Sequence, residues 1–419
     1  MSTHSPSGRD VSRPEFIALM AALMALNALA IDVMLPALPY MGEALQVTNE
    51  NERQWVISAY MLGFGVSQLA LGPLSDRFGR RPPLMVGLVI YIIAAVAAVL
   101  APNFATLLIL RAVQGAGAAG TRVITTSIVR DKYSGRAMAE VMSLIFMVFM
   151  VIPIVAPGIG QVILLTGPWQ YIFLFMGGLA AVFGIWAFLR LPETLVPANR
   201  RPLTFSAVTE GFRIVFTNRV AISYGMAGTF LFGALFGFIT TSQQIYVDIY
   251  GLGPYFPVAF AAMAGLMSVS SFLNSRIVAR HGMRRISHFA MVTFVVMSGI
   301  WFAISLLGPM PLWLFFSLLA VIMFMFGWAS SNMNSLSMEP LGAVAGTASS
   351  VFGFIQTVGG AMIGSFIGQH FNGTVTPVAA GYFFVGAMAL VCVLIAERGR
   401  LFGTGAQYAK TDFSHHEAH

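Results

Sequence analysis

Three ionisable side chains lie inside long apolar segments, where a charge is expensive. Asp32 falls in the segment 15–38, and Arg111 and Arg122 fall in the segment 104–128. An unpaired charge in the middle of a bilayer costs at least about 2.5 kcal/mol, so such residues face a partner or a water-filled cavity. These three residues are the first candidates for chemistry in this chain.

The segment 104–128 carries a polar stripe along one side of its expected helix. Arg111 and Arg122 are 11 residues apart, which at about 3.6 residues per turn places them on one face. Gln114 and Thr125 fall near that face, and we predict that Gln114, Arg122 and Thr125 line a substrate cavity. Three interpretations of Arg122 stay open: it snorkels towards the cytoplasm, binds the Thr125–Ser127 region through water, or meets an acidic or electron-rich substrate group.

Asp32 and Arg111 are expected at the same depth in the membrane. Asp32 lies about six residues before the outer end of its segment and Arg111 about seven after the outer end of its own, so both lie roughly 10 Å from that face. Desolvation favours the protonated form of Asp32, whereas a nearby Arg111 favours the carboxylate. Two interpretations remain, a proton switch and a static ion pair that locks the two helices together.

The elements that position these residues follow from the composition. Of 419 residues, 57% are hydrophobic and 9% are charged, against roughly 25% charged residues in a soluble domain, so most of the surface must face lipid. Spanning a membrane takes about 20 mostly apolar residues, and twelve segments qualify. They are 15–38, 54–74, 83–101, 104–128, 138–165, 168–191, 220–247, 255–279, 286–308, 311–336, 345–370 and 376–397. We predict an all-α membrane protein with two bundles of six helices.

The basic residues predict the orientation. Of 23 Lys and Arg residues, 20 fall in the two termini and in the connections that follow even-numbered segments, whereas the opposite side has Arg53 alone. By the positive-inside rule, both termini are cytoplasmic. The net charge of +7 then reflects topology, and we expect no nucleic-acid partner. The single cysteine, Cys392, excludes a disulfide framework and a cysteine-based metal site.

The longest of these inner connections divides the chain into two parts. We predict a cytoplasmic N-terminal tail, an N-terminal bundle, a cytoplasmic linker, a C-terminal bundle and a cytoplasmic C-terminal tail, over 1–14, 15–191, 192–219, 220–397 and 398–419 respectively. Apolar residues in the linker have approximate helical spacing, which suggests a short amphipathic helix on the inner leaflet. These residues are Leu203, Val208, Phe212, Val215 and Phe216.

The two bundles also repeat a short pattern at an offset of 203 residues. Arg77, Gly79 and Arg81 correspond to Arg280, Gly282 and Arg284. Parallel repeats of this kind occur in secondary transporters, which bind substrate between the repeats near the middle of the membrane.

The connection after the second segment resembles the signature loop of the major facilitator superfamily, Gly-x-x-x-Asp-Arg-x-Gly-Arg-Arg. Its residues are Gly72, Asp76, Arg77, Gly79, Arg80 and Arg81. We predict that these residues form a gating loop, in which Asp76 holds the two bundles together by lying near the N-terminus of the helix that begins around Gly346. The alternative is that the loop only anchors the chain through its positive charges.

Four further motifs extend the resemblance over the membrane region. Arg111, Gln114 and Gly115 are similar to the Arg-x-x-Gln-Gly motif of this superfamily. Segments 191–195 and 345–356 resemble the bicyclomycin and chloramphenicol resistance (Bcr/CflA) branch of the drug:proton antiporters. A last set of residues resembles the antiporter motif of drug exporters, although Ala156 replaces an expected glycine. Its prolines bend the helix, and its glycines allow close packing. That set is Pro153, Pro157, Gly158 and Gly160.

The resemblance implies proton-coupled efflux of small, mainly apolar drug-like compounds, with Asp32 and Arg111 coupling transport to protons. The same motifs occur in importers, so proton-coupled uptake or facilitated diffusion of a nutrient is the alternative. An enzyme would need a cluster of catalytic groups, which the segments lack, and we expect no cofactor or metal. We expect a monomeric, multi-pass protein of the bacterial inner membrane. In the second bundle, the expected substrate-cavity residues are Tyr224, Gln243, Asn332 and Gln356.

Overall fold

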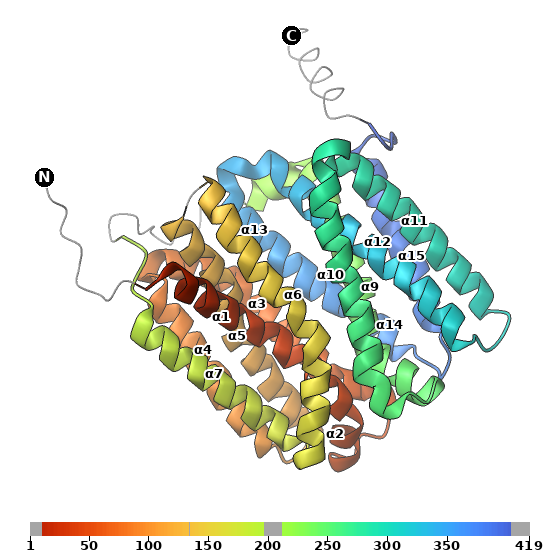
Figure 1. The fold of residues 1–419 in the computed structure, drawn as a ribbon, viewed down its shortest axis with the longest axis horizontal. Helices are drawn as coiled ribbons and strands as arrows, with labels where there is room; N and C mark the ends of the chain where they lie inside the picture. Colours follow the sequence, from red (N-terminus) through yellow and green to blue (C-terminus); the bar gives the residue numbers. More distant parts are fainter. Residues whose placement is uncertain (1–10, 134, 197–211, 404–419) are drawn as a thin grey trace, which may run out of the picture. The chain divides into compact units, whose positions relative to one another are not determined.

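The chain folds into helices, as its composition predicts (Figure 1). The computed structural model describes residues 11–133, 135–196 and 212–403, and α-helices with short 3₁₀ and π segments form all the regular structure of these ranges. The chain divides into two compact units, residues 1–204 and 205–419. The division falls inside the connection 192–219. The all-helical fold is therefore confirmed.

Each unit has its own set of long helices. The first unit contains α1 (Arg13–Asp32), α2 (Leu38–Ala44), α3 (Trp55–Phe78), α4 (Arg81–Val99), α5 (Phe104–Lys132), α6 (Gly135–Thr166) and α7 (Gln170–Arg190). The second unit contains α9 (Arg219–Gln243), α10 (Phe256–His281), α11 (Met283–Ser305), α12 (Leu312–Met338), α13 (Ala345–Phe354), α14 (Gly360–Gln369) and α15 (Thr376–Ala396).

These helices suit a membrane by length and composition. Eleven helical stretches of the described residues are long and apolar enough to cross one. The remaining expected span, 138–165, corresponds to the 32-residue helix α6, whose described apolar part is Val151–Thr166. The fold is therefore that of a multi-pass membrane protein.

The first expected span is confirmed as a helical stretch suited to a membrane, but it extends to Ala44 and contains a break. Helix α1 ends at Asp32, a 3₁₀ turn covers Leu35–Ala37, and α2 continues to Ala44. Pro36 explains the break, because its ring has no N–H for the carbonyl of Asp32 four residues earlier and collides with that carbonyl. The break therefore places Asp32 at the last position of α1.

Helix α6 packs directly against this break. Its residue Gly160 lies so close that an added Cβ would be 2.1 Å from the carbonyl oxygen of Val33 and 3.0 Å from the Cγ of Pro36. Gly158, two residues earlier, has nothing within 4 Å of an added Cβ. The expected close packing is thus present at Gly160 and absent at Gly158. Pro153 and Pro157 both lie inside the continuous helix α6.

Two other expected spans contain π segments. Helix α9 passes into a π segment at Gln244–Ile249, and the span expected at 345–370 is α13 and α14 joined by a π segment at Ile355–Gly359. Such π-bulges are rare and often lie at functional sites. Both residues expected in the substrate cavity lie next to these segments: Gln243 is the last residue of α9, directly before the first, and Gln356 is the second residue of the other.

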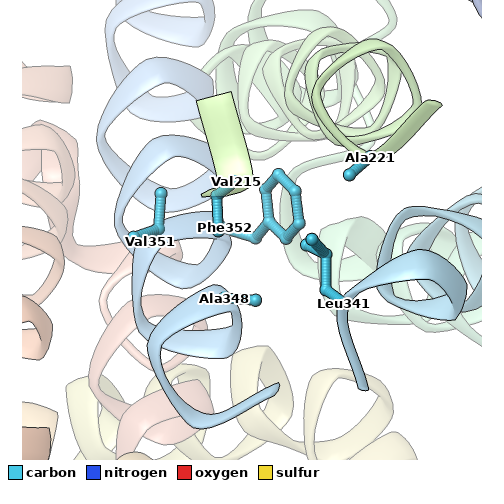
Figure 2. Close-up of a cluster of buried hydrophobic side chains, with 6 residues drawn as sticks. All are labelled: Val215, Ala221, Leu341, Ala348, Val351 and Phe352. Atoms are coloured by element: carbon cyan, nitrogen blue, oxygen red, sulfur yellow. The ribbon is translucent and has the colours of Figure 1, made fainter. Parts of the chain in front are cut away.

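The last part of the linker is a short helix that packs against the second unit, and it is not an independent surface helix. Residues 212–217 are helical, while Leu203 and Val208 lie outside the described residues. Val215 is fully buried in a cluster with residues of α9, α13 and the 3₁₀ segment before α13, and the ring of Phe352 lies among them (Figure 2). Phe216 is 51% exposed. The hydrophobic face of this helix therefore belongs to the core of the second unit.

We expect Gly160→Ala to destabilise the protein and Gly158→Ala to leave its stability unchanged or raise it. Overpacking of a tight contact typically costs about 1–3 kcal/mol, whereas alanine in an open helical position gains up to about 1 kcal/mol over glycine. The measurement is the thermal unfolding midpoint of each purified variant in detergent. Equal midpoints for the two variants would contradict the contact between α6 and the break in α1.

Candidate functional site

Arg111 is the most deeply enclosed charge of the first unit. Its side chain is fully buried and donates hydrogen bonds to the carbonyl oxygens of Ala30 (2.8 Å) and Val56 (3.1 Å) and to Oε1 of Gln114 (2.6 Å). The guanidinium also lies 4.5 Å from the ring centroid of Tyr60, where a cation is attracted to the aromatic face. Arg111 thus connects α1, α3 and α5.

The bond from Arg111 to Ala30 lies at the break in α1. The last carbonyl groups of a helix have no partner within the helix, and a cation near them is favourable because of the helix dipole. Arg111 therefore caps the interrupted end of α1. This contact agrees with the expectation that Arg111 and the region of Asp32 lie at the same depth in the membrane.

The expected ion pair between Asp32 and Arg111 is not formed. Asp32 is 4% exposed, and none of the ion pairs or hydrogen bonds between described residues involves its carboxyl group. Arg111 bonds to the backbone two residues before Asp32 instead. The reason is the break itself, which offers a free carbonyl group that Arg111 reaches without needing a carboxylate.

The other polar residues of α5 have different environments. Gln114 is fully buried and belongs to the hydrogen-bond set of Arg111, and Thr125 is also fully buried. Arg122 is only partly buried. The structure therefore separates the predicted polar stripe into an enclosed part around Arg111 and an accessible position at Arg122.

The predicted gating loop is held by buried ionic contacts inside the first unit. Arg80 is 3% exposed and contacts Asp76 (2.5 Å), Asp131 at the end of α5 (2.8 Å) and the hydroxyl of Ser75 (2.9 Å). Burial alone disfavours its charge, but the hydrogen bonds that Arg80 donates to Asp131 and Asp76 outweigh burial and raise the pKa of Arg80. Arg80 is thus the centre of the loop.

Glu193 fixes the backbone of the same loop. Its carboxylate accepts hydrogen bonds from the backbone N–H groups of Arg80 (2.8 Å) and Arg81 (3.1 Å). Gly79 has φ +100°, and an added Cβ would lie 2.5 Å from Glu193 Oε2, so both conformation and space require glycine. The signature glycine therefore makes room for the carboxylate that caps α4.

The remaining loop residues have looser contacts. The carbonyl of Gly72 accepts a hydrogen bond from Ser75 (2.9 Å). Arg77 is exposed, with its guanidinium 5.4 Å from the ring of Phe78, and Arg81 bonds to the carbonyl of Phe188. A role of these residues in gating stays a prediction.

Tyr224, which was expected in the substrate cavity, belongs to a buried polar cluster. Its hydroxyl donates to Glu397 (2.7 Å) and lies 3.0 Å from Nε2 of His288. Glu397 also accepts a hydrogen bond from Nε of Arg284 (3.0 Å), and Nδ1 of His288 accepts one from the backbone of Phe402 (2.9 Å). This cluster joins α9, α11 and the end of α15.

The other candidate cavity residues of the second unit are almost completely buried. Asn332 donates to the side chain of Asn274 (2.8 Å) and so links α12 to α10. Gln356 is 8% exposed, and its Nε2 lies 2.9 Å from the position of an added Cβ on Gly228 of α9. Gln243 is 6% exposed. Substrate contact by these residues stays a prediction.

Sequence reasoning missed the roles of Asp131 and Glu397. The internal repeat offered a weak signal for Glu397, because it lies 204 residues after Glu193, one residue away from the 203-residue offset that relates Gly79 to Gly282. Gly282 also has positive φ, +79°. The side chain of Arg284 contacts Glu397, whereas Arg81 contacts Glu193 through its backbone N–H. Asp131 gave no comparable signal, because it stands among the basic residues of its connection.

We expect Arg111→Lys to destabilise the first unit. Lysine cannot reproduce the planar fork that reaches three acceptors on three helices, and each hydrogen bond to a charged group contributes about 1.5–3 kcal/mol. The measurement is the thermal midpoint in detergent, with Arg13→Lys as the control because Arg13 forms an exposed pair with Glu140. A midpoint equal to that of the control would contradict the bridging role.

We expect Glu397→Gln to lower stability much more than Glu339→Gln. Both carboxylates contact Arg284, but the side chain of Glu397 is 3% exposed and that of Glu339 is 50% exposed. Breaking a buried pair costs about 3–5 kcal/mol, whereas an exposed pair contributes at most about 1 kcal/mol. Urea unfolding of the two variants tests this, and similar losses would refute the difference.

Known proteins resemble this chain over most of its length. It is 29% identical to the "Bicyclomycin resistance protein homolog" of Haemophilus influenzae, over 90% of this chain and 94% of that protein. It is also 29% identical to "Multidrug resistance protein D" of Escherichia coli, over 83% and 86%. These names agree with the branch that the motifs indicate.

Solved structures share the fold. A bacterial homolog of the human lysosomal transporter Spinster, in an inward-facing and occupied conformation, has a TM-score of 0.67 at 15% identity and covers 94% of this chain and 96% of its own. A D-xylose–proton symporter has a TM-score of 0.66 at 14% identity, covering 91% and 95%. The family model of the Major Facilitator Superfamily matches residues 20–365. The chain therefore belongs to the major facilitator superfamily of membrane transporters.

Proposed function

We propose that this transporter exports small, mainly apolar drug-like compounds in exchange for protons. The names of its relatives, which are bicyclomycin and multidrug resistance proteins, support drug efflux. The observation that carries proton coupling is Asp32, a carboxyl group buried at the break of α1 without an ion-pair or hydrogen-bond partner among the described residues. A lone acid at this depth is a favourable place to take up and release a proton.

Asp32 and Arg111 form the proposed switch. When Asp32 is protonated, Arg111 keeps its bonds to the carbonyl groups of Ala30 and Val56, as in this structure. Loss of the proton creates a carboxylate within one turn of that contact, and the carboxylate competes for the guanidinium because a charged acceptor binds it more strongly than a carbonyl group. The proton thereby decides whether Arg111 caps α1 or pairs with Asp32.

The break in α1 turns this exchange into movement. A helix interrupted by proline lacks hydrogen bonds at the break and bends there at lower cost than an intact helix. Release of Ala30 by Arg111 removes the cap of α1, next to the tight contact of Gly160 with Val33. We infer that the angle between α1 and α2 changes with the protonation of Asp32. The carrier then binds substrate and proton in alternation.

The orientation and assembly belong to the same proposal. Both termini face the cytoplasm, because the basic connections stay on that side, and the loop around Arg80 then lies at the cytoplasmic surface, where it acts in closing the inner gate. The carrier acts as a monomer and needs no cofactor. Its inner-membrane location follows from its family and its apolar helices.

We expect Asp32→Asn to abolish proton-driven efflux while the protein still inserts, because an amide cannot exchange a proton. The measurement is a drug-susceptibility panel in a bacterium without its own efflux pumps. Glu43→Gln is the matched control, since Glu43 is an exposed acid on α2. Normal resistance with Asp32→Asn would refute the role of Asp32.

Everted vesicles with an acidified interior separate export from uptake. For an antiporter, substrate added outside the wild-type vesicles dissipates the acid interior, and vesicles with Asp32→Asn show no such loss. The antiport mechanism is wrong if a compound to which the transporter confers resistance in the panel leaves the proton gradient of wild-type vesicles unchanged.

A further inference from the structure

The second arginine of α5 has no hydrogen-bond acceptor among the residues that the structure describes. The side chain of Arg122 forms no ion pair or hydrogen bond with any described residue, although its backbone carbonyl accepts one from Thr126. Arg111 on the same helix uses three acceptors. The five N–H donors of the Arg122 guanidinium are therefore available.

Four described carboxylates of the first unit are occupied elsewhere or lie too far away. Asp131 and Asp76 both contact Arg80, and Glu15 pairs with Arg190. Asp32 lies near the level of Arg111, which is about 16 Å from Arg122 along the helix. None of these described acids therefore balances the charge of Arg122.

The neighbouring hydroxyl group is also without a partner. Thr125 is fully buried, and its Oγ1 forms no hydrogen bond within the described part of the chain. Residues three apart on a helix are neighbours on its surface, so a cation and an unsatisfied hydroxyl lie within one turn. Since buried polar groups in native proteins almost always have partners, this pair indicates a ligand that supplies oxygen acceptors.

The depth of Arg122 argues against an orientation of its side chain towards the membrane surface. It lies 18 residues after Phe104 and 10 before Lys132, or about 27 Å and about 15 Å from the two ends of α5. Snorkelling serves residues near helix ends. Arg122 is nevertheless partly exposed, so a molecule in contact with α5 can reach it.

We propose that Arg122 and Thr125 bind a carboxylate group of the transported compound, so that the substrates include amphipathic organic acids. The guanidinium fork matches a carboxylate with two parallel hydrogen bonds, and the threonine hydroxyl supplies another donor. An uncompensated positive charge also repels permanently cationic compounds. This inference rests on the proposed function as a small-molecule transporter and specifies its substrate class.

The test compares acids with their uncharged amides on the purified full-length protein in detergent. The probes are benzoate, salicylate and nalidixate, each paired with its primary carboxamide, and the readout is the ligand-induced shift in thermal unfolding midpoint as a function of concentration. We expect at least one acid to bind the wild type about tenfold or more tightly than its amide. Arg122→Gln reduces this ratio to less than about twofold, and Arg122→Lys keeps part of it.

Two controls separate binding from folding. Arg122→Gln without ligand keeps or raises the wild-type midpoint, because the variant loses a charge that none of the described residues balances. Arg53→Gln, which removes a basic side chain near the start of α3, leaves the acid-to-amide ratio unchanged. The inference is overturned if no acid in the panel is preferred over its amide, or if the preference persists in Arg122→Gln.

The assay contains no proton gradient, so it is independent of the coupling mechanism. Asp32→Asn retains the preference for the acid if Arg122 carries it. Absence of antiport in wild-type vesicles, with an intact acid preference, would therefore count against antiport alone. Intact antiport in wild-type vesicles without an acid preference would count against the role of Arg122 alone.

Discussion

A guanidinium enclosed in an apolar bundle must find hydrogen-bond acceptors there, and Arg111 takes them from several helices. Its bonds to Ala30, Val56 and Gln114 connect α1, α3 and α5. Two of the three acceptors are backbone carbonyl groups, and one of these belongs to the interrupted end of α1. The arginine is thus satisfied without a carboxylate, and this leaves Asp32 uncompensated beside it. The arrangement of this site depends on this difference between a fully bonded arginine and an unpaired carboxyl group.

A second constraint acts where the helices of each unit turn. In the first unit, Gly79 leaves space for Glu193, which holds the start of α4. In the second unit, Glu397 holds Arg284 at the start of α11, after Gly282. The repeat has a physical basis, since each unit uses a glycine with positive φ and a carboxylate that follows its last long helix. The difference is that Glu193 bonds mainly to the backbone, whereas Glu397 is buried among side chains.

Helix α5 shows how one sequence pattern serves two purposes. Arg111 and Arg122 share a face by periodicity, yet one is enclosed by three helices and the other is partly exposed. An enclosed arginine with three acceptors stabilises the bundle, whereas an arginine without acceptors is ready to bind. This contrast links the stability of the first unit to its proposed selectivity.

The sequence alone determined the membrane class, the helical fold and the family. Long apolar segments and the signature loop carry those properties locally, because the hydrocarbon thickness fixes the length of a span and glycine alone tolerates the conformation at Gly79. It also identified Asp32, Arg111 and Arg122 as unusual, since charge is rare in such segments.

Only the tertiary structure decided what these residues contact. Periodicity gives the face of a helix but not the neighbour beyond it, and a backbone carbonyl freed by a break is invisible in a list of side chains. For that reason Arg111 was expected to pair with Asp32, and instead it bonds to Ala30. Tyr224 was expected in a cavity for its polarity, but packing places its hydroxyl on Glu397, a residue brought near only when α9 and α15 lie side by side.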